Sequence, residues 1–286
     1  MANSLRSPFF WGGQRDSPTG LMNYPTYVIH VKKGFEARER SIVTQFYQLG
    51  LPFHWILEHD IADLSPDTLA RYGYNGLALK PAEISCSLKH ITAWERIAAA
   101  DRGGLVFEDD VILDPNTFRP IMECALKEFF TKYGDNGYLS LGDGCAMYVP
   151  WTKHQKNSHL YPAEQVRATD SYFLTKTAAI SMLDLLYQEG FFLPADHMIN
   201  RLCHQLSIPI FWLAPTVASQ GSHTGVFPSQ IQHKDRGSIK EKINWIIKKF
   251  RRKYLYPLLG GDQRKINLAL KQTLKISEHN PNGGYN

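Results

Sequence analysis

Residues 105–113 are Leu105-Val106-Phe107-Glu108-Asp109-Asp110-Val111-Ile112-Leu113, an apolar strand interrupted by three acids. Adjacent carboxylates between apolar residues repel one another and resist burial unless a cation or hydrogen-bond donors compensate them. Because strand side chains alternate, we expect Glu108 and Asp110 on one face and Asp109 on the other. Two carboxylates at the carboxyl end of a sheet strand suit Mn²⁺ or Mg²⁺ bridging to a diphosphate. The alternative is that the strand ends here and the acids cap the loop or the next helix.

The segments before this strand predict a parallel sheet. Residues 26–31 are a β-rich run, 37–49 have helical apolar spacing and stop at Gly50, and 53–57 are a second apolar run. Strand, helix and strand within about 30 residues form a βαβ unit, whose strands are parallel. A second amphipathic helix begins at Pro81 and ends at the glycines before the acidic strand.

The same alternation continues after the acidic strand. We expect helices near 118–129, 177–188 and just after Asp196, and strands at 138–141, 172–174 and 208–213. Residues 143–169 have no clear period, which is typical of a functional or a disordered loop. The sequence therefore predicts an α/β fold with a mainly parallel, helix-flanked sheet.

Composition excludes some classes of protein. The 286 residues are 43% hydrophobic and 21% charged, which supports a packed core and excludes a disordered chain. Lys and Arg (32) exceed Asp and Glu (27), but eight basic residues and one acid fall between 236 and 253. The positive charge thus belongs to one segment of a near-neutral protein, which argues against a nucleic-acid partner.

Cysteine spacing and hydropathy predict the compartment. The four cysteines contain no CxxC pair, which favours a reducing environment over disulfides or a zinc site. Residues 1–20 lack the apolar run of a secretory signal, and no run of about 18 apolar residues predicts a membrane-spanning helix. We expect a cytoplasmic protein, with peripheral contact at the inner membrane left open.

Two motifs together resemble glycosyltransferase family 25, which includes bacterial lipooligosaccharide galactosyltransferases and collagen galactosyltransferases. They are Glu83-Ile84-Ser85-Cys86-Ser87-Leu88-Lys89-His90, followed by Trp94, and the Glu-Asp-Asp strand. The resemblance covers about 26–231, leaving an irregular arm (1–25) and a basic helical segment (232–286). Ser85 and Lys89 stand where the family usually has Gly and Ser, which puts the donor or acceptor edge near His90 in doubt.

The resemblance implies a GT-A type fold and an inverting, nucleotide-sugar-dependent transferase with Mn²⁺ or Mg²⁺. Asp110 is then the first metal ligand, with Glu108 as a second ligand or a ribose contact and His223 as a third ligand. The implied donor-binding residues are Arg38, His90, Glu108, Asp109, Gln220 and Ser222. Taken without the resemblance, Arg38 is a surface helix residue, His90 a core histidine bonded to a backbone carbonyl, and 220–225 a solvated loop.

The catalytic base is expected on a different element from the acidic strand. The resemblance marks Asp196 as a site residue, either the base or an acceptor-binding group, and Asp170 is the second candidate. The alternative role for Asp196 is a plain N-cap of the short helix that follows it. A helix N-terminus would also lower its pKa and weaken it as a base.

The basic C-terminal segment is amphipathic. Apolar residues recur at three- and four-residue steps from Ile239 to Leu259, with Lys and Arg between them. This pattern is typical of helices that bind anionic membrane surfaces. It is equally typical of a helix that docks on its own domain and leaves its basic face in solvent.

The functional prediction is transfer of galactose or glucose from UDP-galactose or UDP-glucose to a terminal sugar of a lipooligosaccharide or lipopolysaccharide acceptor. Two other functions remain open. One is a metal-dependent phosphoester hydrolase, although such enzymes generally need more His and Asp motifs for two metals. The other is a non-catalytic sugar- or nucleotide-binding paralogue with the same fold.

Overall fold

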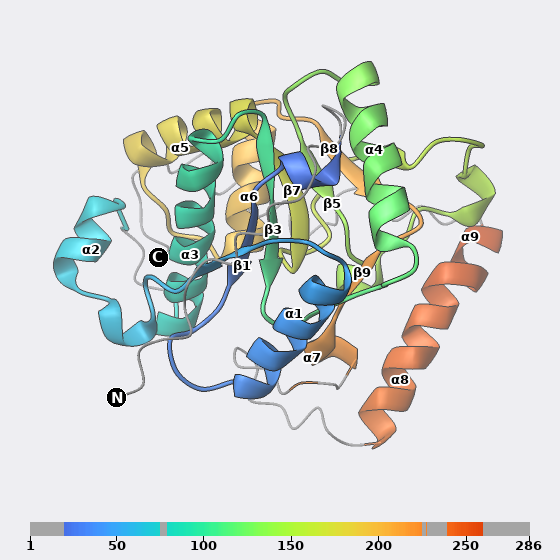
Figure 1. The fold of residues 1–286 in the computed structure, drawn as a ribbon, viewed down its shortest axis with the longest axis horizontal. Coiled ribbons are helices and arrows are strands. Elements are labelled where there is room, and N and C mark those ends of the chain that lie inside the picture. The colour runs from blue at the N-terminus through green and yellow to red at the C-terminus, as the bar shows by residue number, and fades with distance from the viewer. Residues whose placement is uncertain (1–19, 75–78, 225–226, 228–238, 260–286) are drawn as a thin grey trace.

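A seven-stranded sheet forms the centre of the computed structural model, which describes residues 20–74, 79–224, 227 and 239–259 (Figure 1). The strand order is β2-β1-β3-β7-β5-β8-β6. Strands β7 and β6 run antiparallel to their neighbours, and the others share one direction. The strands are β1 (Thr26–Ile29), β2 (His54–Ile56), β3 (Gly103–Glu108), β5 (Tyr138–Ser140), β6 (Leu160–Ala163), β7 (Ser171–Thr175) and β8 (Ile210–Leu213). The expected mainly parallel α/β fold and the β1–α1–β2 unit are confirmed.

Helices cover both faces of this sheet (Figure 1). One layer contains α3 (Pro81–Ala98), α5 (Lys176–Glu189) and α6 (Ala195–Gln205), with α2 (Pro66–Arg71) at its margin; the other contains α1 (Glu36–Gln48) and α4 (Phe118–Lys132). Because strand side chains alternate, Val106 packs into the core under α3, whereas Leu105 and Phe107 pack into the core under α1 and α4. Burial on both faces explains the nearly continuous apolar composition of β3.

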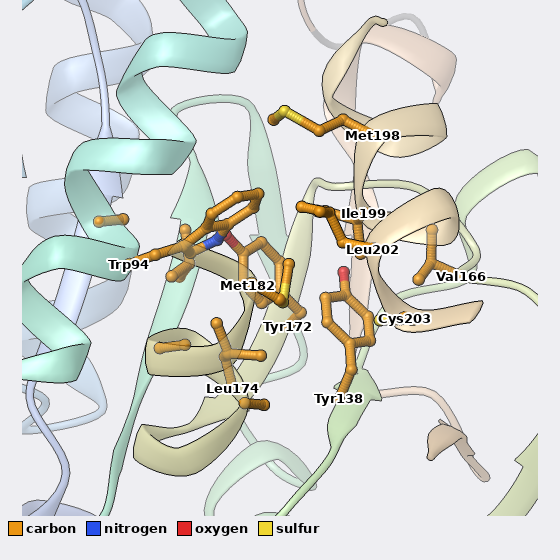
Figure 2. Close-up of a cluster of buried hydrophobic side chains, with 14 of the residues drawn as sticks. Trp94, Tyr138, Val166, Tyr172, Leu174, Met182, Met198, Ile199, Leu202 and Cys203 are labelled. Atoms are coloured by element: carbon orange, nitrogen blue, oxygen red, sulfur yellow. The ribbon is translucent and has the colours of Figure 1, made fainter. Parts of the chain in front are cut away.

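The core under α3, α5 and α6 contains a polar link between aromatic side chains. Figure 2 shows the indole nitrogen of Trp94 next to the hydroxyl of Tyr172, to which it donates a hydrogen bond of 2.9 Å. The rings of Tyr138 and Tyr172 stack with centroids 4.9 Å apart. This core therefore places a hydroxyl group between α3 and the centre of the sheet.

The acidic run is not one strand, which corrects the sequence prediction. Strand β3 ends at Glu108, the chain turns at Asp109 and Asp110, and β4 (Val111–Leu113) pairs with β9 (Ala218–Gln220) in a separate two-stranded sheet. Val111 lies opposite Gln220 in this pairing. The small sheet therefore brings the residues that follow β9 to the acidic turn.

Residues 143–169 contain regular structure that the sequence did not indicate. Short 3₁₀ turns occupy Gly144–Ala146 and Trp151–Lys153, and β6 adds an antiparallel edge to the sheet beside β8. Pro162 lies inside β6. Proline is tolerated there because an edge strand can lose one N–H donor, yet it weakens a strand prediction.

The C-terminal segment is helical over its described part, as predicted. Helix α8 (Ile239–Phe250) continues through a π-helical turn (Arg251–Leu255) into α9 (Tyr256–Leu258). It lies outside both helical layers, along the edge of the molecule (Figure 1). Among the described residues, no helix has the length and apolar character needed to cross a bilayer.

Candidate active site

A pocket of about 600 Å³ opens where β1 and β3 end. Its walls come from the loop after β1, the segment 60–63, the start of α3, the acidic turn and the residues after β9. The carboxyl ends of parallel strands are where open α/β sheets bind ligands. Most of the predicted donor and metal residues line it, namely Arg38, Glu108, Asp109, Asp110, Gln220 and Ser222.

Asp109 is held by the side chains of a histidine and an arginine. One carboxylate oxygen lies 2.6 Å from His30 Nδ1, and the other accepts a 2.6 Å hydrogen bond from Arg38. All three residues are buried, and the Arg38 guanidinium also lies over the ring of Phe35. Asp109 therefore joins the end of β3 to β1 and α1. Arg38 also lines the pocket, and one of its guanidinium nitrogens donates to Asp109.

Asp110 carries a buried oxygen that lacks a hydrogen-bond partner. The Ser222 N–H donates to Oδ2 at 3.2 Å, the Gly221 N–H donates to the Asp110 carbonyl at 2.7 Å, and Oδ1 has no hydrogen bond within the described part of the chain. Burial, and then the charge of Glu108, raise the pKa of Asp110 to about 6. Asp110 is therefore a buried acid close to a second acid, Glu108, and one of its two carboxylate oxygens has no donor within the described part of the chain.

Glu108, in contrast, is stabilised in its charged form. Burial alone would raise its pKa, but His90 and a 2.6 Å hydrogen bond from the Thr169 hydroxyl lower the pKa below its ordinary value. An ionised Glu108 next to Asp110 with a free oxygen is a pair of hard oxygen donors. This donor set fits Mg²⁺ or Mn²⁺.

His90 is fully buried behind Glu108 and does not line the pocket, which corrects its predicted contact with the donor. Its partner is a hydroxyl rather than the backbone carbonyl that the alternative required. The Tyr172 hydroxyl accepts the Trp94 N–H and forms a hydrogen bond of 2.9 Å with His90 Nδ1. The other ring nitrogen of His90, Nε2, lies 3.5 Å from Glu108 Oε1 and has no hydrogen bond within the described part of the chain. His90 is thus a buried neighbour of Glu108 inside the core and not a pocket-lining residue.

Removal of the Tyr172 hydroxyl tests this link. In Tyr172→Phe, the indole of Trp94 and the Nδ1 atom of His90 each lose a buried partner, so we expect the free energy of unfolding to fall by about 2 kcal/mol. Urea unfolding measures this change. Tyr138→Phe is the matched control, because its buried hydroxyl makes only a 3.4 Å bond to the Ala168 carbonyl. Equal losses in the two variants would contradict the link.

Asp170 lies in the core next to the acidic turn, outside the pocket lining. Its backbone carbonyl accepts from the Glu108 N–H at 2.9 Å, and its carboxyl accepts from the Ser171 hydroxyl at 2.9 Å. Burial, followed by the charge of Glu108, raises the pKa of Asp170 to about 8. In the metal-free protein this carboxyl is therefore protonated at neutral pH, which disfavours it as the base.

Asp170→Asn should stabilise the metal-free protein increasingly as pH rises. The pKa of Asp170 is about 8 in the folded protein, above its ordinary value of 3.8, so its ionisation lowers the free energy of unfolding as pH rises from 3.8 to about 8. Above that range the loss stays constant. The asparagine lacks this loss, so we expect the variant to gain up to about 5 kcal/mol over the wild type at alkaline pH and little at acidic pH. Urea unfolding with a chelator at both pH values measures the gain, with the exposed Asp184→Asn as control. A pH-independent difference would refute the assignment.

Asp196 is the second residue of α6, and Pro194 occupies the N-cap, so the capping alternative is wrong. Its carboxylate accepts the N–H of His197 at 2.9 Å and does not line the pocket. Cys86 lines the pocket, and the pKa of its thiol is raised by burial and then by the negative charges of Glu108 and Asp196. Asp196 is thus close enough to Cys86 for their charges to interact. Asp196 therefore belongs to the same end of the molecule.

His223 falls within α7 (Gly221–Thr224), but its side chain lies outside the described residues.

Sequence reasoning missed the role of Lys89. Its buried ammonium donates to the His30 carbonyl at 2.9 Å, the Glu58 carbonyl at 2.7 Å and the Asp60 carboxylate at 2.7 Å. These contacts join α3 to the segments that follow β1 and β2 at the pocket wall. The available signal was a lysine on the apolar side of a helix, in place of the usual serine of the family.

A second missed feature is a compact group of ligating side chains. Cys86 and His90, one helical turn apart on α3, and Glu108 each place a ligating atom within 4.8 Å of the others. The burial that raises the pKa of the Cys86 thiol disfavours the thiolate that a metal would need. The oxygen pair of Glu108 and Asp110 is therefore the better candidate metal site.

A mainly parallel, helix-flanked sheet with an acidic pocket at the ends of its strands defines an α/β protein with a ligand site. The model of glycosyltransferase family 25 (LPS biosynthesis protein) matches residues 23–199, more than half of the chain. The protein therefore belongs to glycosyltransferase family 25 and is a glycosyltransferase.

Similarity to solved structures is low. The inositol-1-phosphate CTP transferase from T. maritima is 10% identical with a TM-score of 0.39, over 81% of this chain and 98% of that one. The UTP-bound UGPase from Acinetobacter baumannii is 8% identical with a TM-score of 0.37, over 83% of this chain and 97% of that one. A comparison with curated proteins found no match.

Proposed function

We propose that this glycosyltransferase moves galactose or glucose, with inversion, from a UDP-sugar to a terminal sugar of a lipooligosaccharide or lipopolysaccharide acceptor, using Mn²⁺ or Mg²⁺. The observation that carries the proposal is the unpartnered Oδ1 of Asp110 beside an ionised Glu108 in a pocket of about 600 Å³. A pocket of this size suits a small-molecule ligand.

Asp110 and Glu108 would hold the cation, and we propose His223 as a third ligand. The raised pKa of Asp110 supports this, because a cation would relieve the repulsion between the two carboxylates. When bound, the cation would supply neutralisation of the negative charge on the departing diphosphate.

The protein's own groups would bind and orient the donor. Phe35 offers an aromatic face at the pocket wall, and Lys33 adds a cation there. The Arg38–Asp109 pair keeps the first turn of α1 beside the acidic turn. Gln220 and Ser222, delivered by β9, border the metal side of the pocket.

The acceptor hydroxyl must lose its proton to a base, and we propose Asp196 for this role. Asp170 is disfavoured because it is buried and protonated at neutral pH. Asp196 is half-buried at the start of α6, next to the α3 side of the pocket. Of the two candidates, Asp196 is the one closer to solvent.

A panel of radiolabelled nucleotide sugars tests the proposal. We expect transfer from UDP-galactose or UDP-glucose to a lipooligosaccharide acceptor, with slow release of UDP without acceptor, loss of both with a chelator and recovery with Mn²⁺. Turnover of simple phosphomonoesters instead would indicate a hydrolase. Metal-linked UDP binding in calorimetry without any transfer would indicate a binding paralogue.

A further inference from the structure

The C-terminal helix exposes its apolar side. Ile243, Ile246, Ile247, Phe250 and Tyr254 recur at three- and four-residue steps, so they share one side of the helix, and each is between 46% and 65% exposed. The following Leu258 and Leu259 are 63% and 85% exposed. Together, residues 243–259 carry the largest group of exposed apolar side chains in the described part of the chain.

Part of the same segment contacts the protein through cationic side chains and a proline. Lys249 Nζ lies 2.7 Å from Asp143, Lys253 lies over the ring of Tyr148, and Pro257 is buried. A surface helix of a globular protein normally buries its apolar stripe and leaves its polar face in water. This helix leaves its apolar stripe exposed as well, so it does not dock on the domain through its apolar side.

Cationic side chains border the apolar stripe. Between residues 239 and 259 the sequence has seven basic residues and one acid, Glu241. A groove of about 490 Å³ beside the stripe combines Ile247 and Leu255 with Lys248, Arg251 and Arg252. An apolar surface edged by several cations and one anion complements a layer of acyl chains under anionic headgroups.

We propose that Ile239–Leu259 docks on an anionic lipid surface, with the stripe inserted at the level of the headgroups. Helix α8 contacts α7, whose Ser222 N–H reaches Asp110, so a docked membrane lies beside the sugar-transfer pocket. The choice of a membrane over a protein partner rests in part on the proposed function, since a glycolipid acceptor is presented at such a surface. The charge pattern favours it independently.

Vesicle flotation of the full-length protein tests the proposal. We expect the wild type to float with vesicles of phosphatidylcholine mixed with phosphatidylglycerol, and far less with phosphatidylcholine alone. Ile246→Glu should lower the partition coefficient at least about tenfold, because a buried apolar side chain becomes a buried charge. Arg251→Gln should lower it about fivefold and weaken its salt dependence.

Ile180→Glu on α5 is the matched control, since Ile180 is also an exposed helical isoleucine, at 40%. Wild-type protein that stays in solution with anionic vesicles would overturn the proposal, as would an equal loss in Ile180→Glu. A dimer that Ile246→Glu dissociates, without vesicle binding, would assign the stripe to a second copy instead. Flotation needs no donor, metal or acceptor, so its outcome is separate from transfer measured on a water-soluble oligosaccharide acceptor.

Discussion

Asp110→Asn is expected to lower the rate of sugar transfer by about 10³-fold, equivalent to about 4 kcal/mol of transition-state stabilisation. Asparagine keeps the shape of the side chain and can still accept the Ser222 N–H. It places a neutral amide where Asp110 Oδ1 now lies buried without a partner. Metal-dependent binding of UDP, measured by calorimetry, should weaken in parallel.

The same variant should not unfold more easily. The pKa of Asp110 is raised to about 6, so its ionisation opposes folding as pH rises toward and through that value, and asparagine removes this opposition in chelated protein. A loss of activity with unchanged or higher stability therefore identifies a functional group. Asp101→Asn, which changes an exposed carboxylate on another loop, serves as control. Full activity in Asp110→Asn would show that the acidic pocket is not the donor site.

Lys89→Met is expected to lower the free energy of unfolding by about 3–5 kcal/mol, because removing one member of a buried ion pair leaves the other uncompensated. The ammonium is 3% exposed and bonds two backbone carbonyls as well as Asp60. Methionine has a similar length but cannot donate to any of the three. The loss is measured by urea unfolding.

Two comparisons make this result interpretable. Lys132→Met breaks a pair with Glu128 in which the lysine is 52% exposed, and we expect a change below about 1 kcal/mol. The double variant Lys89→Met/Asp60→Asn removes both charges and should recover part of the loss. If Lys89→Met costs no more than Lys132→Met, the three bonds of Lys89 do not hold the pocket wall in solution.

Much of the fold could be predicted from local patterns. The 3.6-residue spacing of α1 and α3, the apolar runs of β1, β2 and β3, and the glycine stops were sufficient for a helix-flanked parallel sheet. The break between β3 and β4 was not predictable in this way. It depends on the pairing of Val111 with Gln220, more than one hundred residues later, and no local pattern encodes that partner.

The candidate site was also predictable in part, and the missed part again depends on contacts between residues far apart in the sequence. The family resemblance placed Arg38, Glu108, Asp109, Asp110, Gln220 and Ser222 in the site, and they line one pocket. The position of His90 was missed because its bond to Tyr172 spans 82 residues, and strand β7, which carries Tyr172, runs against the direction of β3. Spacing along a helix gives the side on which a residue lies, but not the side chain that it meets there.

The pairing of β4 with β9 has a practical consequence for expression work. The stretch that identifies the family stops at residue 199, whereas β9 and the Ser222 N–H lie beyond it. A fragment trimmed to the recognisable stretch would leave the edge of β4 open to other chains and Asp110 without its remaining donor. Inactivity of such a shortened protein would therefore reflect a missing wall of the pocket rather than the wrong sugar in the assay.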